Sequence, residues 1–259
     1  MRRYSSILVL CVAACAAPPT RLPLLVPFSP TNGATPVPGN GIGLGMDIGS
    51  SLRGPELARG EIRTASIGVG MGDRFSIWYG SPHSDDYVDG AHAHTGVEQV
   101  RAKVLLARPF EGRAALAILG GHAWGQRTAV GFVTYPSYAS VPLQDDKVWS
   151  WEVAAPAELL LGRRRAEARP SVFLGPRVVY MRYDDRLRQD GTFTTFFSGA
   201  VGGLHVSTYN CEFFFESTVA YVPQRVFLGG NVGGHLAVMP ALGIVFRIGS
   251  PYHWGLLRR

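Results

Sequence analysis

The sequence predicts an all-β fold: an up-and-down antiparallel transmembrane β-barrel of about ten strands, with eight strands as an alternative. Three observations support this prediction. Apolar residues recur at every second position, the alternating runs are long, and short links alternate with long links along the chain. The composition agrees with a single barrel, because 46% of the 259 residues are hydrophobic, only 17% are charged and 32 are glycine.

The first residues have the pattern of a bacterial secretion signal. Basic residues at 2–3 precede an apolar run at 7–14, and small residues follow that run. The run is shorter than the ~20 residues that a membrane-spanning helix needs. The four residues "VAAC" that end at Cys15 resemble the bacterial lipobox, and this resemblance implies cleavage before Cys15 and acylation of its thiol. The alternative is an ordinary signal peptide that is cleaved near Ala17.

The chain divides into four predicted parts: a signal peptide at 1–14, a tether at 15–40, a barrel at 41–249 and a C-terminal tail at 250–259. The tether is rich in proline, which favours extended backbone without a partner strand. Cleavage removes two of the 25 basic residues and lowers the formal net charge from +6 to +4. The remaining basic residues are scattered, so we expect no nucleic-acid partner. Cys211 has no partner in the mature chain, so we expect no disulfide framework.

Alternating segments justify the strands in order. In the first of them, "GIGLGMDIG" at 41–49, Ile, Leu and Met alternate with Gly and Asp. Several segments exceed a dozen residues, whereas strands of soluble proteins cluster near 5–6 and a membrane-crossing strand needs about 9–11. The length therefore favours membrane-spanning strands. The predicted strands are 41–52, 61–71, 74–81, 96–108, 113–124, 147–161, 167–182, 192–207, 212–222 and 234–249.

The links between these strands alternate in length. The short links are 72–73, 109–112, 162–166 and 208–211, and the long ones are 53–60, 82–95, 125–146, 183–191 and 223–233. Short turns on one side and long loops on the other are typical of up-and-down barrels in membranes. An even strand count places both termini on the short-turn, periplasmic side. Aromatic residues near strand ends, such as Trp78 and Tyr79, suggest girdles at the membrane interfaces.

Over residues 41–249 this pattern resembles bacterial outer-membrane β-barrels as a broad class. The resemblance implies a location in the outer membrane of a Gram-negative envelope, with outer-membrane lipid and lipopolysaccharide as partners. It implies no cofactor and names no protein partner. One departure is that the chain continues through "SPYHWGLLRR" after the last predicted strand, whereas such barrels often end in an aromatic residue.

The polar faces of the strands supply the main set of candidate site residues, which we expect to line the lumen. Glu152 and Glu158 lie across a predicted hairpin from Arg169 and Arg177, so cross-strand ion pairs are expected. Such a lining is consistent with a plug whose polar side chains bind one another, and also with a narrow pore. The set comprises Asp47, Arg101, Lys103, Glu152, Glu158, Arg169, Arg177, Glu212, Glu216 and Arg247.

Two other stretches contain chemically suggestive residues. "HSDDYVDGAHAH", in a predicted external loop, carries imidazoles and carboxylates that can bind divalent metals, but their spacing matches no fixed ligand pattern. "LHVS" resembles the His-x-Ser element of the outer-membrane lipid A 3-O-deacylases, which implies a triad of His205, Ser207 and an acidic residue, here Glu212 across the predicted turn. No metal site is predicted, and the weak metal candidates are His83, Asp85, Asp86, His92 and His94.

Three functions are consistent with the sequence. The favoured one is non-enzymatic: an outer-membrane barrel, and a lipoprotein if Cys15 is acylated, with a structural, loop-presenting or narrow-pore role. The second is a lipid A-modifying hydrolase that uses His205 and Ser207. The third is a soluble periplasmic lipoprotein barrel that binds an apolar ligand inside. The direction in which Ile42, Leu44 and Val238 point separates the third function from the others, because a soluble core would turn these side chains inward.

Overall fold

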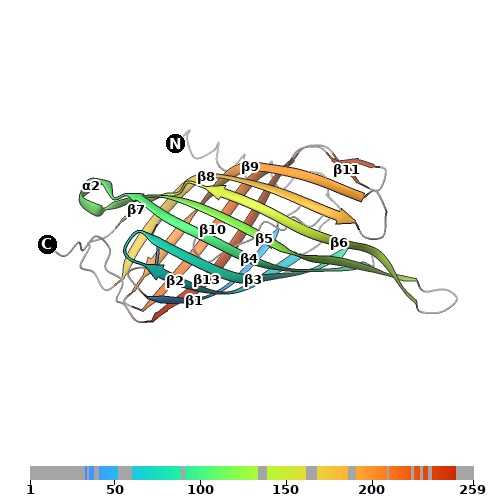
Figure 1. Cartoon of the computed structure of the whole chain (residues 1–259), viewed down its shortest axis with the longest axis horizontal. Coiled ribbons are helices and arrows are strands. Elements are labelled where there is room, and N and C mark those ends of the chain that lie inside the picture. Colours follow the sequence, from blue (N-terminus) through green and yellow to red (C-terminus); the bar gives the residue numbers. More distant parts are fainter. Residues whose placement is uncertain are drawn as a thin grey trace, which may run out of the picture.

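The computed structural model is a closed barrel of long, tilted antiparallel strands (Figure 1). No helix in the described part of the chain has the length and apolar character to cross a membrane. The predicted signal peptide, Cys15 and the tail at 250–259 lie outside the described residues. These are 33, 35–37, 41–51, 60–88, 91–133, 139–161, 168–185, 191–208, 210–222, 225–227, 230–232 and 235–248.

Each barrel strand pairs antiparallel with its neighbours, and β1 pairs with β13 to close the barrel. β6 and β7 together form one crossing, interrupted at Ala155 and at Pro156, which has no backbone N–H for the ladder. The described strands therefore make ten crossings, which confirms the predicted fold class. The strands are β1 Ile42–Ser51, β2 Gly60–Met71, β3 Phe75–Val88, β4 Ala91–Ala107, β5 Ala114–Val133, β6 Ala139–Ala154, β7 Ala157–Leu160, β8 Arg169–Asp185, β9 Gly191–Ser207, β10 Cys211–Val222 and β13 His235–Ile248.

Three small elements lie in the links. The turn labelled α2, Pro109–Gly112, joins β4 to β5, and Phe110 and Glu111 both have φ of 54°, so it is a tight turn and not a helix. β11 (Arg225–Phe227) and β12 (Gly230–Val232) pair as a separate hairpin between β10 and β13. The turn from β2 to β3, at 72–74, is shorter still, and its Gly72 adopts φ of 66°, a conformation that glycine reaches without steric cost.

Two strand pairs are longer than the sequence predicts. The predicted loop at 82–95 is mostly strand, since β3 continues to Val88 and β4 begins at Ala91. The predicted loop at 125–146 likewise contains the ends of β5 and β6. Polar residues at 83–85 and 126–128 stand where the apolar alternation that marks the rest of each strand would continue, so this signal is missing there.

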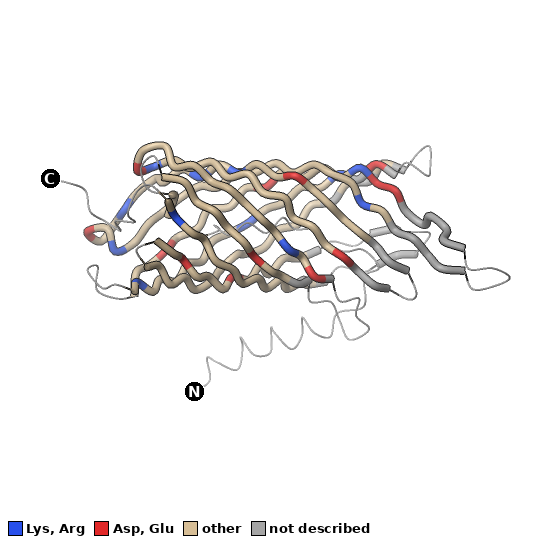
Figure 2. Tube along the Cα trace, turned by 90° about the horizontal axis from the view of Figure 1, so that it is seen from below, with Lys and Arg blue, Asp and Glu red and all other residues tan. Residues whose placement is uncertain are grey.

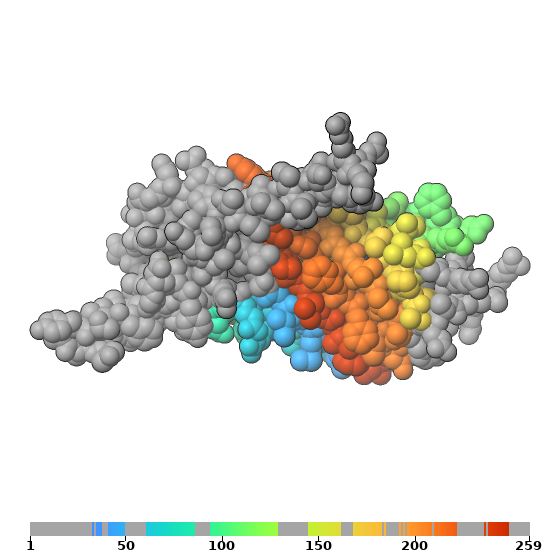
Figure 3. All heavy atoms as spheres, turned by 180° about the vertical axis from the view of Figure 1, so that it is seen from behind, coloured from blue at the N-terminus to red at the C-terminus, as the bar shows by residue number. Residues whose placement is uncertain are grey.

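The outer surface of the barrel is apolar. Ile42 and Leu44, which a soluble barrel would turn inward, are each 41% exposed on the outer face. Figure 3 shows one such face, on which β1, β13 and β10 lie side by side. Toward the long-link end aromatic side chains, such as Trp151 and Tyr180, border this apolar surface, and charged residues such as Arg182 follow. An apolar belt with an aromatic border is the pattern of a membrane-spanning barrel.

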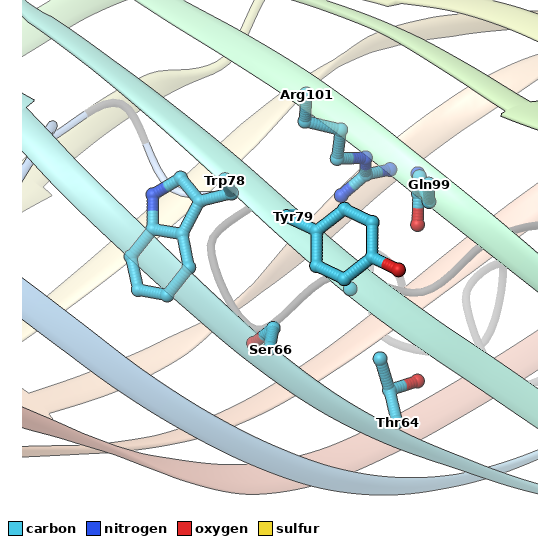
Figure 4. Close-up of a pocket in the computed structure, with 7 residues that line it drawn as sticks. Thr64, Ser66, Trp78, Tyr79, Gln99 and Arg101 are labelled. Atoms are coloured by element: carbon cyan, nitrogen blue, oxygen red, sulfur yellow. The ribbon is translucent and has the colours of Figure 1, made fainter.

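Charged residues occur along the whole length of the barrel wall (Figure 2). In its central part they are buried and point inward, as the two-residue period requires. Trp78, predicted for an interface girdle, also points inward and is 3% exposed, whereas its neighbour Tyr79 is 44% exposed on the outer face. Figure 4 shows these two rings leaving β3 in different directions, with Arg101 and Gln99 on β4 beside them.

Candidate functional site

The lumen contains a buried ion-pair network centred on Glu152 of β6. Arg101 of β4 binds both oxygens of this carboxylate, with Nη2 2.6 Å from Oε2, and Arg177 of β8 approaches the same Oε2 at 2.5 Å. Gln99 donates to Oε1 at 3.1 Å, and Arg177 also donates to Thr218 at 2.9 Å. The predicted cross-strand pair between Glu152 and Arg177 is confirmed. The network joins four parts of the wall across the lumen.

A second buried network surrounds His205 of β9. Its Nε2 lies 2.9 Å from Glu216 Oε1, and its Nδ1 lies 3.2 Å from Glu212 Oε1. Glu212 also binds Arg247 and accepts a hydrogen bond from Ser207 Oγ at 3.3 Å. The imidazole is therefore held between two carboxylates that belong to β10, the neighbouring strand.

The three residues of the hydrolase hypothesis lie together, but their hydrogen bonds do not follow the serine–histidine–acid order of a catalytic triad. His205 and Ser207 point into the lumen, each 2% exposed, and both contact Glu212. A serine nucleophile needs a base that accepts its proton. Here Ser207 donates to the carboxylate, while carboxylates occupy both nitrogens of His205. The cluster links strands through hydrogen bonds and leaves the hydroxyl inside the barrel, away from lipid.

A segment of the chain before β1 lies inside the lumen. The N–H and Oγ1 of Thr35 both donate to Glu158 Oε2, at 3.0 and 2.9 Å, and Lys103 Nζ donates to the carbonyl of Thr35 at 3.2 Å. Val37 is buried against Trp78, Phe214 and Val245. A Cβ at Gly33 would lie 2.5 Å from the imidazole of His205, so the chain passes this ring closely. We name the described residues 33 and 35–37 the lumenal segment.

An apolar layer crosses the lumen on the long-link side of these networks. On β4, for example, Val97 belongs to the layer, and Gln99, Arg101 and Lys103 follow toward the short-turn end. The layer draws side chains from eight strands, β2, β4, β5, β6, β8, β9, β10 and β13. Its members are Ile62, Val97, Ala123, Val148, Val179, Met181, Phe197, Ala220, Met239 and Ala241.

All of the residues that the sequence places in the lumen are buried. Two of the predicted ion-pairing carboxylates differ in their partners: Glu152 binds arginines, whereas Glu158 binds Thr35, accepts from Ser171 at 2.7 Å and lies 3.8 Å from His205. The charges of the set are balanced, with acidic Asp47, Glu152, Glu158, Glu212 and Glu216 against basic Arg101, Lys103, Arg169, Arg177 and Arg247. The sequence did not predict that Thr35 binds Glu158, that His205 is the centre of a buried network, or that an apolar layer crosses the lumen.

Asp47 differs from the other buried carboxylates, because neither of its oxygens has a hydrogen-bond partner although it is 4% exposed. The ionised form of a buried carboxyl group without a partner is unfavourable. We expect Asp47→Asn to stabilise the folded barrel by about 1–2 kcal/mol in alkaline buffer, where the carboxyl group is ionised, measured by urea unfolding in lipid vesicles. Glu158→Gln is the matched control and should lower the stability, since Glu158 accepts three hydrogen bonds. Lower stability of Asp47→Asn would show that the carboxylate has a partner in solution.

The weak metal candidates lie on strands and not in a loop. His83 and Asp85 belong to β3, and His94 belongs to β4. His94 Nδ1 lies 2.9 Å from Asp85 Oδ1, and the rings of His83 and His94 are 6.2 Å apart. The side chains of Asp86 and His92 are outside the described residues. Within the described part of the chain no three His, Cys, Asp or Glu side chains converge on a point that could hold a metal ion.

The fold and the polarity of its two faces define the class of this protein: it is a ten-stranded antiparallel β-barrel of the outer-membrane type, apolar outside and charged inside. Among solved structures it is similar to the translocator domain of autotransporter NalP from Neisseria meningitidis, with a TM-score of 0.52, 12% identity, and coverage of 80% of this chain and 87% of that one.

Two further structures are more distant. The beta domain of the Bordetella autotransporter BrkA gives a TM-score of 0.36 at 11% identity, covering 80% of this chain and 99% of that one. The outer-membrane protease OmpT from Escherichia coli gives 0.34 at 9% identity, covering 81% and 94%. Neither the protein-family models nor the curated proteins include a match to this sequence. At such identities the likeness shows the fold alone.

Proposed function

We propose that this chain is an outer-membrane β-barrel with a closed lumen and a structural, loop-presenting role. The apolar layer carries the proposal, because side chains from eight strands meet there and leave the lumen without the water that ions need to pass. The ion-pair networks and the lumenal segment occupy the same lumen nearer to the short turns. The apolar layer and the charged networks are two successive barriers along the lumen, and together they support a plug and disfavour a narrow pore.

The long hairpins support the second half of the proposal. On β3 the outward side chains change from apolar Ile77 and Tyr79 to Ser81, His83 and Asp85, so the strand continues into water. β5 and β6 extend further still at this end of the barrel (Figure 1), and Gln126 donates to Asp145 across them at 2.7 Å. A rigid wall beneath these hairpins holds them at a fixed height above the membrane.

The "VAAC" motif supports the further proposal that Cys15 is acylated and the chain is a lipoprotein. The even number of crossings supports placing both termini on the periplasmic side, where a lipid on Cys15 would insert into the inner leaflet of the same membrane. Such a lipid adds little to the attachment of a spanning barrel, so its role would lie in sorting. The intact mass of the mature protein distinguishes a diacylated Cys15 from an unmodified N-terminus near Ala17.

Planar-bilayer recording of the purified protein tests the closed lumen. We expect folded protein, recognised by faster gel migration before boiling than after it, to produce no conductance steps. Steps of uniform size from heat-modifiable protein would contradict the plug and establish the narrow pore. Absence of heat-modifiable migration, or release of the protein from membranes by carbonate, would contradict the membrane barrel itself. A change in lipid A mass on expression would instead establish the hydrolase.

A further inference from the structure

A cavity of about 240 Å³ opens at the short-turn end of the barrel, where the turn between β2 and β3 meets the end of β4. Two backbone-anchored contacts shape it: Leu105 N–H donates to the carbonyl of Arg74 at 2.7 Å, and Arg108 Nη2 donates to the carbonyl of Asp73 at 3.3 Å. The cavity is lined by Asp73, Arg74, Leu105, Leu106, Ala107 and Arg108. None of these residues belongs to the lumenal networks.

Two cations flank this cavity. Arg74 is exposed, and among the described residues its guanidinium has no hydrogen-bond or ion-pair partner. Arg108 is half-buried and uses one nitrogen for the Asp73 carbonyl, which fixes the guanidinium at the rim and leaves its other N–H groups for a ligand. The carboxylate of Asp73 reduces the local charge but does not cancel it. Two guanidinium groups around one hollow are suited to a phosphate, which accepts paired N–H donors.

Leu106, which lines the cavity, belongs to the membrane-facing belt. Leu106 is 55% exposed on the outer face of β4, and Val104 and Val100 continue the same outward row at 42% and 38%. A free phosphate ion would gain nothing from this row. A phospholipid would use both parts, with its phosphate between the arginines and an acyl chain along Leu106 and Val104.

We propose that Arg74, Arg108 and Leu106 form a binding site for one anionic phospholipid of the leaflet that borders the short turns. The site rests on the proposed membrane location and orientation, in which the short turns border the periplasmic leaflet. The lipid would fill the angle between the β2–β3 turn and β4, and would fix the height of the barrel in the membrane at that point. The ligand is identified by its chemistry: a phosphodiester with an adjoining acyl chain.

Native mass spectrometry of the detergent-folded protein with added phosphatidylglycerol tests the site. We expect one tightly retained lipid per wild-type barrel, and at least about a tenfold loss of retention in Arg74→Gln/Arg108→Gln, because two charge-assisted contacts are removed. Leu106→Gln should weaken lipid retention while both arginines remain. Arg63→Gln/Arg182→Gln, which removes two exposed arginines at the opposite end of the barrel, is the matched control and should retain the lipid.

Each possible outcome contradicts a different part of the proposal. Equal retention by the wild type and Arg74→Gln/Arg108→Gln overturns the site while heat-modifiable migration still supports the barrel. If inorganic phosphate is retained by the wild-type barrel as tightly as phosphatidylglycerol in the same spectra, the lipid is overturned in favour of a free-anion site. Loss of heat-modifiable migration in all variants and in the wild type contradicts the membrane barrel, and with it the location on which the site depends.

Discussion

Replacing Glu152 with alanine is expected to destabilise the barrel by about 3–5 kcal/mol. The carboxylate binds Arg101 and Arg177, and each of these side chains is 2% exposed. Removing the anion leaves two buried like charges close together without their counter-ion. Urea unfolding in lipid vesicles, followed by gel migration without boiling, measures the loss directly.

Glu61→Ala is the control for Glu152→Ala. Glu61 also binds an arginine, Arg63 at 2.8 Å, but their side chains are 48% and 72% exposed. Exposed pairs contribute about 0–1 kcal/mol, so this variant should unfold nearly as the wild type does. The triple variant Arg101→Met/Glu152→Leu/Arg177→Met should recover most of the stability, since no charge remains buried. Equal losses in Glu152→Ala and Glu61→Ala would refute the burial argument.

The sequence was sufficient for the barrel because the membrane imposes a simple rule on every strand. Lipid outside and a polar lumen inside force alternation with a period of two, and Ile42 to Ile48 show it residue by residue. The rule ends where the strand leaves the membrane. From Ser81 to Asp85 the residues of β3 are mostly polar on both faces, so the chain remains a strand while the apolar alternation disappears.

The contents of the lumen were predictable only in part. Alternation assigned Glu158 to the inner face, but it could not supply its partners, since Thr35 contacts Glu158 across 123 residues of sequence. Prolines at 18–38 indicated an extended chain and gave no reason to place any of it inside the barrel. The apolar layer could not be predicted from the sequence for a different reason. Its residues, such as Met181 and Met239, interrupt the polar faces only once or twice in each strand, and they meet only when the barrel closes.

Gly68→Leu is the second substitution with a large expected effect, and it acts through the packing of Trp78. A Cβ added at Gly68 would overlap the indole, and one at Gly43 would lie 2.5 Å from the far edge of the same ring. The two glycines of β1 and β2 thus provide the space for Trp78, which also contacts Val37 of the lumenal segment. We expect Gly68→Leu to cost about 3 kcal/mol or more, because the added side chain would occupy the space of the buried indole.

The double variant Gly68→Leu/Trp78→Ala provides the decisive comparison. Trp78→Ala alone should cost about 3–5 kcal/mol, because it leaves a cavity between the wall and Val37. In the double variant the leucine fills that space, so the combined loss should be smaller than the sum of the two single losses by at least about 1 kcal/mol. Additive losses would show that the two side chains do not share one space.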